Sequence, residues 1–251
     1  MNGSSGGVAA LAALRELAPS GVLRVAINCA NPVLVQRNVE SGMLSGVSVD
    51  LACELARELG VKPQLVPFDA SGEAFEAIAS GDCDIGFLAI DPERAARLSY
   101  TAPYVLIHGG YLMHKHSPFV KAVDVDQPGV RIASVREAAY DLYLSRTLKH
   151  AELVYAATSA GAVDMLLSGG ADVAAGVYKP LAETASSQPG LKMADGYFMV
   201  IQQAMTVSKS RTIALAYLCE YIERLKKSGF VAEALVRSGQ AGVQIAPPTQ
   251  E

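Results

Sequence analysis

Several common functional signals are missing from this sequence of 251 residues. No apolar run is long enough to cross a bilayer as a helix, which takes about 18 residues, so we expect no membrane span. Lys and Arg number 21 against 25 Asp and Glu, and the net charge of −4 gives no electrostatic reason to expect nucleic acid or acidic lipid as a partner. A GxSxG elbow, a P-loop and a GxGxxG turn are also absent, and so are the enzyme and nucleotide-binding signatures that they mark.

Cysteine is scarce and has no metal-binding spacing. The four cysteines are Cys29, Cys53, Cys83 and Cys219, without a CxxC pair, and His114 and His116 lie far from them in sequence. This spacing argues against a structural zinc site and favours buried free thiols. We expect no metal and no cofactor.

The N-terminus also lacks a targeting signal. Met1–Gly7 is small and polar, which predicts a flexible leader, and no Lys or Arg precedes the apolar run Val8–Leu14. The run therefore does not fit a signal peptide. We interpret residues 1–20 as a leader and N-terminal segment, either of a processed chain with an added start or of a cytoplasmic protein.

The first part of the chain alternates strand and helix patterns, and 51% hydrophobic residues suffice for real cores. Short apolar runs predict strands, and apolar residues at helical spacing predict helices between them. The strands are expected at Leu23–Ile27, Pro63–Phe68 and Cys83–Ala89, and the helices at Val49–Leu59 and Glu73–Ala79. This alternation is typical of a mostly parallel sheet.

The same pattern starts again after a long β-rich run, Tyr104–His114. Strands are expected at Val130–Val135, Glu152–Tyr155 and Ala171–Gly176, with helices at Tyr140–Lys149 and Ala160–Leu167. A second β-rich run, Tyr197–Val207, and two helices, Thr212–Ser228 and Val231–Arg237, end the chain. We predict an α/β protein of two lobes with mixed, mostly parallel sheets joined by a two-stranded hinge. Residues 21–107 plus 203–251 form the first, discontinuous lobe, and residues 108–202 the second.

An internal repeat supports the two-lobe prediction. A shift of 88 residues superimposes Ser71 on Ser159, Ala74 on Ala162, Ser80 on Ser168, Gly81 on Gly169 and Asp84 on Asp172. Each pair falls at the same place in a helix-turn-strand unit. The two lobes are therefore interpreted as versions of one βαβ unit.

The most informative segment for chemistry is Gly81–Tyr104. After its buried strand, Asp91 fits the N-cap of a helix and Pro92 the first helical position, which places Arg94 in the first turn. A cation is unfavourable at the positive end of a helix. A bound carboxylate would resolve this, because free N–H groups and a bidentate guanidinium can hold one anion together. The alternative is an ordinary surface arginine.

Four segments together carry a family resemblance: LRVAIN, SGVSVDLACELARELG, SGDCDIGFLAIDPERAARLSYTAPY and GADVAAGV. Over Val22–Gly239 the chain resembles the extracellular solute-binding proteins of ABC transporters, family 3, of the amino-acid-binding type. The resemblance implies a type II periplasmic-binding-protein fold, a small carboxylate-bearing or amino-acid-like ligand, an ABC permease as partner, a monomer and a periplasmic or extracellular location. It also implies that Arg94 grips the ligand carboxylate from the first lobe.

Other positions that the resemblance assigns to the ligand differ from the family pattern. The wall before Arg94 consists of the apolar Phe87, Leu88 and Ala89. The position that pairs with a ligand ammonium falls near Gly176 and Val177, beside Tyr178, and none of these is acidic. The acids expected near this edge of the second lobe are Glu137 and Asp141, which fit an ammonium partner or helix capping.

Four further residues complete the set of candidate ligand contacts. Asn28 ends the first strand, where an amide can bond a carboxylate or an amine, or cap the strand. Of Gln202 and its neighbour on the returning strand, one is expected to face the ligand, and we select Gln202. Tyr104 and Tyr140 fit a stacking surface or the core.

Enzymes share this scaffold, among them dehydratases similar to cyclohexadienyl dehydratase, and so do ligand-sensing input domains. His108 fits a general acid on the hinge or a structural histidine. We expect no catalytic residue. The favoured function is binding of a carboxylate-bearing metabolite in the cleft between the lobes, with closure about the hinge.

Overall fold

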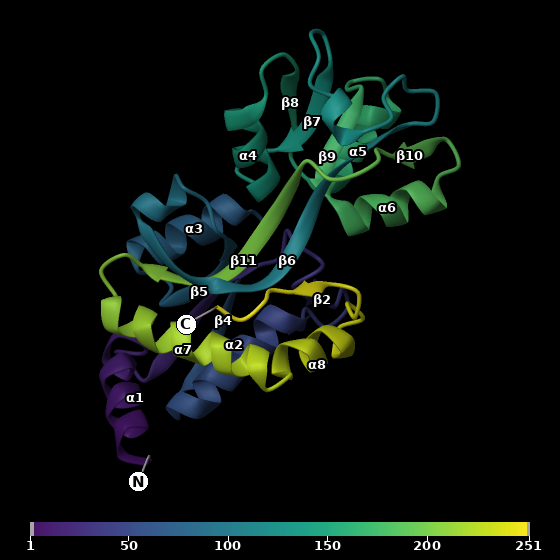
Figure 1. The fold of residues 1–251 in the computed structure, drawn as a ribbon. Coiled ribbons are helices and arrows are strands. Elements are labelled where there is room, and N and C mark those ends of the chain that lie inside the picture. Colours follow the sequence, from purple (N-terminus) through teal and green to yellow (C-terminus); the bar gives the residue numbers. More distant parts are fainter. Residues whose placement is uncertain (1–2, 250–251) are drawn as a thin grey trace. The chain divides into compact units, whose positions relative to one another are not determined.

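The computed structural model describes residues 3–249, which divide into two compact units (Figure 1). Unit 1 holds the chain up to Leu106 and again from Gln202, and unit 2 holds Ile107–Ile201. Both units are α/β with mixed, mostly parallel strands, as predicted. Among residues 3–249, no helix combines the length and the apolar character that a membrane crossing requires.

Three parallel strands form the centre of unit 1. Strand β1 (Val22–Asn28) pairs in parallel with β4 (Lys62–Phe68) on one side and β5 (Ile85–Ala89) on the other. Two long strands follow in the order β5-β11-β6, with β11 (Met199–Ser208) antiparallel to β5. The short β12 (Gln244–Ile245) pairs with β6 (Leu98–His114).

Helices cover both faces of this sheet. On one face, α3 (Ser71–Ser80) packs Ala74, Ala77 and Ile78 against Ala26 and Leu88. The other face carries α2 (Val47–Leu59), α7 (Thr212–Lys227) and α8 (Phe230–Arg237) (Figure 1). The Tyr221 hydroxyl of α7 donates to the Leu51 carbonyl of α2, 2.7 Å away.

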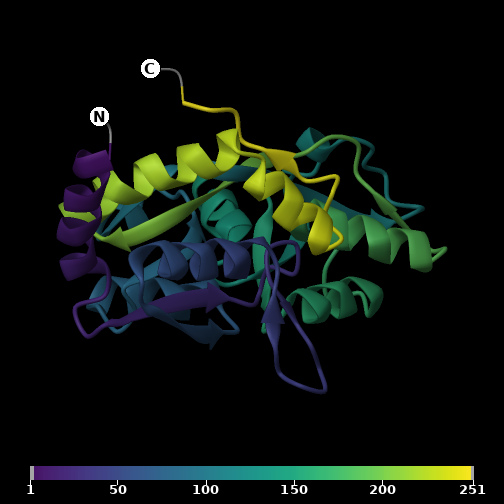
Figure 2. The same cartoon turned by 90° about the horizontal axis from the view of Figure 1, so that it is seen from below.

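The prediction of a flexible leader over Met1–Gly7 is wrong for its described part, because helix α1 covers Gly3–Leu17. The helix lies against α7 (Figure 2). Ala13 and Leu17 are fully buried there, and the Glu16 carboxylate accepts a 2.8 Å hydrogen bond from the Ala214 amide. Tertiary packing thus provides the burial that stabilises this Ala- and Leu-rich segment as a helix.

Unit 2 repeats the parallel core of unit 1. Strand β7 (Arg131–Val135) pairs in parallel with β8 (Glu152–Ala156) and β9 (Val173–Val177). The second half of β6 is antiparallel to β9 and also pairs with β10 (Leu191–Met193). Three helices accompany these strands: α4 (Ala139–Thr147), α5 (Ser159–Leu167) and α6 (Tyr178–Ser187).

The two faces of the unit 2 sheet have separate cores. Tyr140 and Leu144 of α4 pack with Ile132 and Val173, whereas Ala162 and Leu166 of α5 pack with Ala133 and Ala174. Neighbouring strand residues thus point to opposite faces. Two strands connect the units, since β6 passes from Leu106 to Ile107 and β11 from Ile201 to Gln202.

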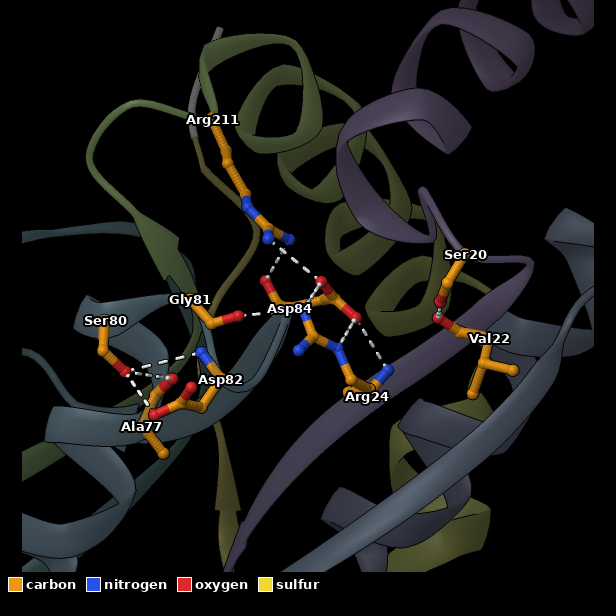
Figure 3. Close-up of polar contacts among 9 residues, drawn as sticks. All are labelled: Ser20, Val22, Arg24, Ala77, Ser80, Gly81, Asp82, Asp84 and Arg211. Carbon is orange, nitrogen blue, oxygen red and sulfur yellow. Dashed lines mark hydrogen bonds and ion pairs between the residues drawn. The ribbon is translucent and has the colours of Figure 1, made fainter.

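Both units carry the same Arg–Asp fork where their central strand begins. Arg24 donates through its backbone amide and Nε to Oδ2 of Asp84, at 2.9 and 3.0 Å, and through Nη2 to Oδ1 at 2.7 Å (Figure 3). Arg131 makes the same three bonds to Asp172, at 2.8, 3.2 and 3.0 Å. The fork links the first and third strand of each βαβαβ unit, so Arg24 and Arg131 are structurally equivalent although the shift of 88 residues does not superimpose them.

Some elements were not predicted. They are the two-residue strands β2 (Gln36–Arg37) and β3 (Leu44–Ser45), the strands β10 and β12, helix α6, and the 3-10 turn Ala122–Asp124. The cysteines in the described residues are free, but only Cys83 is buried, while Cys53 is exposed and the other two are intermediate. The expectation of buried thiols therefore holds for one cysteine.

Candidate functional site

The candidate site of unit 1 lies beyond the carboxyl ends of its parallel strands. β1 ends at Asn28 and β5 at Ala89, and the turn that carries Arg94 follows β5 directly. Open α/β sheets bind their ligands at this edge, because the chain leaves the strands there and its loops converge.

The turn after β5 differs from the prediction. We expected a helix with Pro92 at its first position and free N–H groups, whereas the structure has one 3-10 turn over Arg94–Ala96, preceded by Glu93. Oδ1 of the buried Asp91 accepts from the amides of Glu93, at 2.9 Å, and Arg94, at 3.3 Å. The protein's own carboxylate therefore takes these two amides, which the prediction had assigned to an external anion.

Arg94 is buried at the edge of α3. Arg94 is 5% exposed. Its Nη2 donates to Oγ of Ser71 at 3.2 Å, and its guanidinium carbon lies 5.5 Å from the centre of the Phe75 ring. Ser71 is the first residue of α3. A cation held this far from water interacts strongly with any carboxylate that reaches it.

Tyr100 adds a hydroxyl near this cation. Among the described residues, its hydroxyl oxygen is the buried side-chain polar atom without a hydrogen-bond partner. Burial raises the pKa of Tyr100, and the positive charge of Arg94 partly offsets that rise. Guanidinium and hydroxyl groups are donors that suit a carboxylate, so Arg94, Ser71 and Tyr100 are the candidate carboxylate contacts of unit 1.

The other predicted residues of unit 1 are placed as follows. Leu88 lies in the core against α3, and Ala89 is buried. Phe87 packs edge-on against Tyr104 with ring centres 6.0 Å apart, and the Tyr104 hydroxyl lies 3.0 Å from Oγ of Ser48. Burial raises the pKa of Tyr104. The structure therefore places these side chains in the interior of unit 1.

Asn28 and Gln202 lie nearer the surface. Asn28 is half-buried, and its Oδ1 accepts from the Ala30 amide at 3.1 Å, which is the strand-end capping interaction. The Gln202 side chain is exposed, while its carbonyl accepts from the Ile90 amide at 2.9 Å.

In unit 2, the turn before α4 brings the predicted acids together. Asp141 is 5% exposed and accepts from the Glu137 amide at 2.8 Å and the Ser134 hydroxyl at 3.2 Å. Burial raises the pKa of Asp141, and these two hydrogen bonds oppose the rise. Asp141 therefore holds the turn. Glu137 is exposed and has a φ of 59°, and Tyr140 packs in the core.

Beside the position expected to pair with an ammonium lies an aromatic cluster of His108, Tyr178 and Tyr197. The rings of His108 and Tyr197 stack 3.9 Å apart, and Tyr178 meets Tyr197 edge-on at 4.8 Å. The Tyr178 ring also packs against Gly110, where a Cβ would come within 2.7 Å of the ring, so a larger residue at this position would displace Tyr178. Gly176 and Val177 end β9 immediately before Tyr178.

Sequence reasoning missed Ser71, Phe75, Tyr100 and the aromatic cluster. Ser71 had a usable signal, because it begins a helix after a strand and has the repeat counterpart Ser159. The others depend on contacts between residues far apart in sequence.

The model of the bacterial extracellular solute-binding proteins, family 3, matches residues 23–238. The chain belongs to this family. The match includes every residue of the candidate site in this solute-binding protein. No curated protein sequence matches the chain.

Solved structures agree with the family fold. A mutant of ArgBP from T. maritima is 23% identical with a TM-score of 0.76, over 90% of this chain and 99% of that one. The ancestral amino acid-binding protein AncCDT-1, a precursor of cyclohexadienyl dehydratase, is 24% identical with a TM-score of 0.74, over 89% and 98%. A binding component of an ABC transporter from Wolinella succinogenes, complexed with lysine, is 25% identical with a TM-score of 0.74, over 87% and 95%.

Proposed function

We propose that this solute-binding protein captures an amino acid or a similar carboxylate-bearing metabolite outside the cytoplasm and delivers it, as a monomer, to an ABC-type permease. Arg94 holds the ligand carboxylate, with Ser71 and Tyr100 as further donors. The second unit then closes over the ligand by bending of β6 and β11, the two connecting strands.

The observation that carries this proposal is the burial of Arg94 beside hydroxyl groups at the carboxyl edge of the unit 1 sheet. Burying a guanidinium costs free energy unless hydrogen bonds and an anion offset the lost hydration. A surface arginine keeps its hydration and does not require these hydrogen bonds or an anion. The structures of similar proteins with bound arginine or lysine support an amino-acid ligand.

The second unit favours a ligand with an apolar or planar part. The aromatic cluster and Val177 stand where an ammonium partner was sought, and Asp141 is committed to its turn. Glu137, in the same turn, is exposed. We therefore expect aromatic or other hydrophobic amino acids, or monocarboxylates, to bind better than small polar amino acids.

The second candidate function is a dehydratase-like enzyme on the same scaffold, favoured by the likeness to AncCDT-1. His108 is the sequence candidate for its general acid. In the structure His108 is half-buried and stacks on Tyr197, which suits a packing role. The enzyme is therefore the less favoured function, and a ligand-sensing role is a weaker alternative.

A thermal-shift screen against amino acids, small carboxylates and prephenate or arogenate tests the proposal, with chemical analysis of every hit. A ligand at 100 times its dissociation constant contributes about 2.7 kcal/mol to stability, which raises the melting temperature measurably. We expect an amino acid or carboxylate to stabilise the protein and to be recovered unchanged. Turnover of prephenate or arogenate would make the chain an enzyme, and stabilisation by uncharged or cationic compounds alone would overturn the carboxylate proposal.

A further inference from the structure

The two Arg–Asp forks differ in their surroundings. In unit 1 a second arginine covers the fork: Arg211 donates through Nη2 to Oδ1 of Asp84 at 3.0 Å and through Nη1 to the Asp84 carbonyl at 3.1 Å (Figure 3). The Asp84 side chain is 0% exposed. Two guanidinium groups thus share one carboxylate.

The strand registers identify the counterpart of Arg211 in unit 2. The β11–β5 ladder reaches Thr206 opposite Gly86, so its continuation sets Ser208 opposite Asp84. The β6–β9 ladder reaches Met113 opposite Val173.

Continuation of the β6–β9 ladder sets His114 opposite Asp172. Arg211 follows Ser208 by the same interval in sequence as Ser117 follows His114. Ser117 therefore stands in unit 2 where Arg211 stands in unit 1.

A pocket of about 480 Å³ occupies this place in unit 2. Its walls include Ser117, Arg131, Asp172, His114, His116 and Phe119. The Asp172 side chain is 40% exposed, in contrast to the fully covered Asp84. Among the described residues, Oδ1 of Asp172 accepts from Arg131 only, whereas Oδ1 of Asp84 accepts from two arginines.

We propose that this pocket binds a guanidinium group against Asp172, in the way that Arg211 binds Asp84. The carboxylate supplies charge and a hydrogen-bond acceptor of the right geometry. The stacked rings of His114 and His116, 5.1 Å apart, and the ring of Phe119 offer flat surfaces for a planar cation. The site lies wholly within unit 2 and is independent of Arg94.

One further cation lies close to the pocket and limits its affinity. The Lys192 ammonium donates to the carbonyls of Ser117 and Phe119, at 3.2 and 3.1 Å. These carbonyls satisfy its hydrogen bonds, but its charge repels a second cation through the solvent-exposed pocket. We therefore expect weak binding that salt weakens further.

The guanidinium has two conceivable sources, a free guanidino compound or the arginine side chain of a polypeptide. Butylguanidine and the peptide acetyl-Gly-Arg-Gly-amide probe the two, and butylurea is the uncharged control of the same shape. Amide chemical shifts of isotopically labelled protein report binding. Both guanidinium probes are expected to shift the amides of pocket residues saturably, with butylurea weaker by about tenfold or more. Tighter binding of the peptide indicates a polypeptide source, and tighter binding of butylguanidine a small molecule.

A substitution that fills the pocket provides the second test. Ser117→Arg restores in unit 2 the arrangement of unit 1, while Ser117→Gln adds bulk without charge. We expect Ser117→Arg to melt at a higher temperature than Ser117→Gln and to abolish the shifts caused by butylguanidine. Equal binding of butylurea, no saturable shift, shifts that persist in Ser117→Arg, or a Ser117→Arg variant no more stable than Ser117→Gln would each overturn the proposal.

Discussion

Arg94 and Arg97 lie on the same short turn and over the same Phe75 ring, yet their surroundings differ. The residue Arg94 is 5% exposed, whereas the Arg97 side chain is 49% exposed and pairs with Glu76 at 2.7 Å. An exposed pair of this kind contributes little to stability, because water and salt screen it. The difference in exposure separates a candidate ligand-binding arginine from an ordinary surface one.

Glu137 is the one non-glycine residue with positive φ in the described chain, at 59°. The left-handed conformation costs a residue with a Cβ about 1–2 kcal/mol, which glycine avoids. Glu137→Gly should therefore raise the free energy of unfolding by about 0.5–1 kcal/mol, since greater freedom of the unfolded glycine offsets part of the gain.

Urea denaturation measures this change. Ala138→Gly, at a φ of −65° in the next position, is the control and should give no gain. A loss of stability in Glu137→Gly would show that contacts of the glutamate side chain outweigh the backbone strain.

Asp172 gives a pH dependence with a defined sign. Its hydrogen bonds with Arg131 lower the pKa of Asp172 in the folded state. The fork therefore stabilises the protein at pH values above about 3.9, the pKa of an aspartate in the unfolded chain. This contribution is lost as the pH falls through the lower pKa that Asp172 has in the folded state. Because the pair is about 40% exposed, solvent screens part of the effect.

The difference in free energy of unfolding between the wild type and Asp172→Asn should be present at neutral pH and shrink below about pH 4. Urea denaturation over a pH series measures it, with the exposed Asp164→Asn on α5 as control. A gap that is constant across this range would contradict the assignment.

At the scale of elements, replacing the aspartate of each Arg–Asp fork should lower the free energy of unfolding by unequal amounts. Asp84 is fully buried between Arg24 and Arg211, so its removal leaves two guanidinium groups without their anion. Asp84→Asn should cost about 3–5 kcal/mol, as for other broken buried ion pairs. Asp172→Asn should cost about 1 kcal/mol or less, because the pair is exposed. Chemical denaturation of both variants compares them, and equal costs would contradict the role of burial.

Strong local patterns allowed most elements to be predicted. Buried strands such as Ile85–Ala89 are continuous apolar runs, and helices such as Val47–Leu59 carry apolar residues at helical spacing before a glycine. The two-residue strands β2 and β3 have no such period, and α6 begins with Tyr-Lys-Pro, which resembles a turn. Short or mixed segments take their structure from tertiary contacts that no local pattern shows.

The site was predictable only in part for the same reason. Arg94 stood out because a cation at the start of a predicted helix conflicts with the helix dipole. Its partners could not be read from that pattern, since Ser71 lies on the preceding helix and Tyr100 on the following strand. The sequence equally gives no sign that Tyr104 bonds Ser48, a residue 56 positions away.

At the scale of the whole molecule, the proposed function requires the two units to move. Within residues 3–249, the strands that pass between the units are β6 and β11, so the proposed closure would bend these two strands without breaking either core. Small-angle X-ray scattering should show a smaller radius of gyration when the ligand is bound. An unchanged radius at saturating ligand would contradict closure while leaving binding itself intact.

The measurement that tests the central claim most directly is isothermal titration of the ligand found by screening into wild-type protein, Arg94→Ala and Arg97→Ala. We expect the affinity of Arg94→Ala to fall by about 30-fold or more, because truncating one partner of a buried charge pair costs about 2–5 kcal/mol. Arg97→Ala should bind like the wild type. Full affinity in Arg94→Ala, or equal losses in both variants, would contradict the assignment of Arg94 as the carboxylate-binding residue.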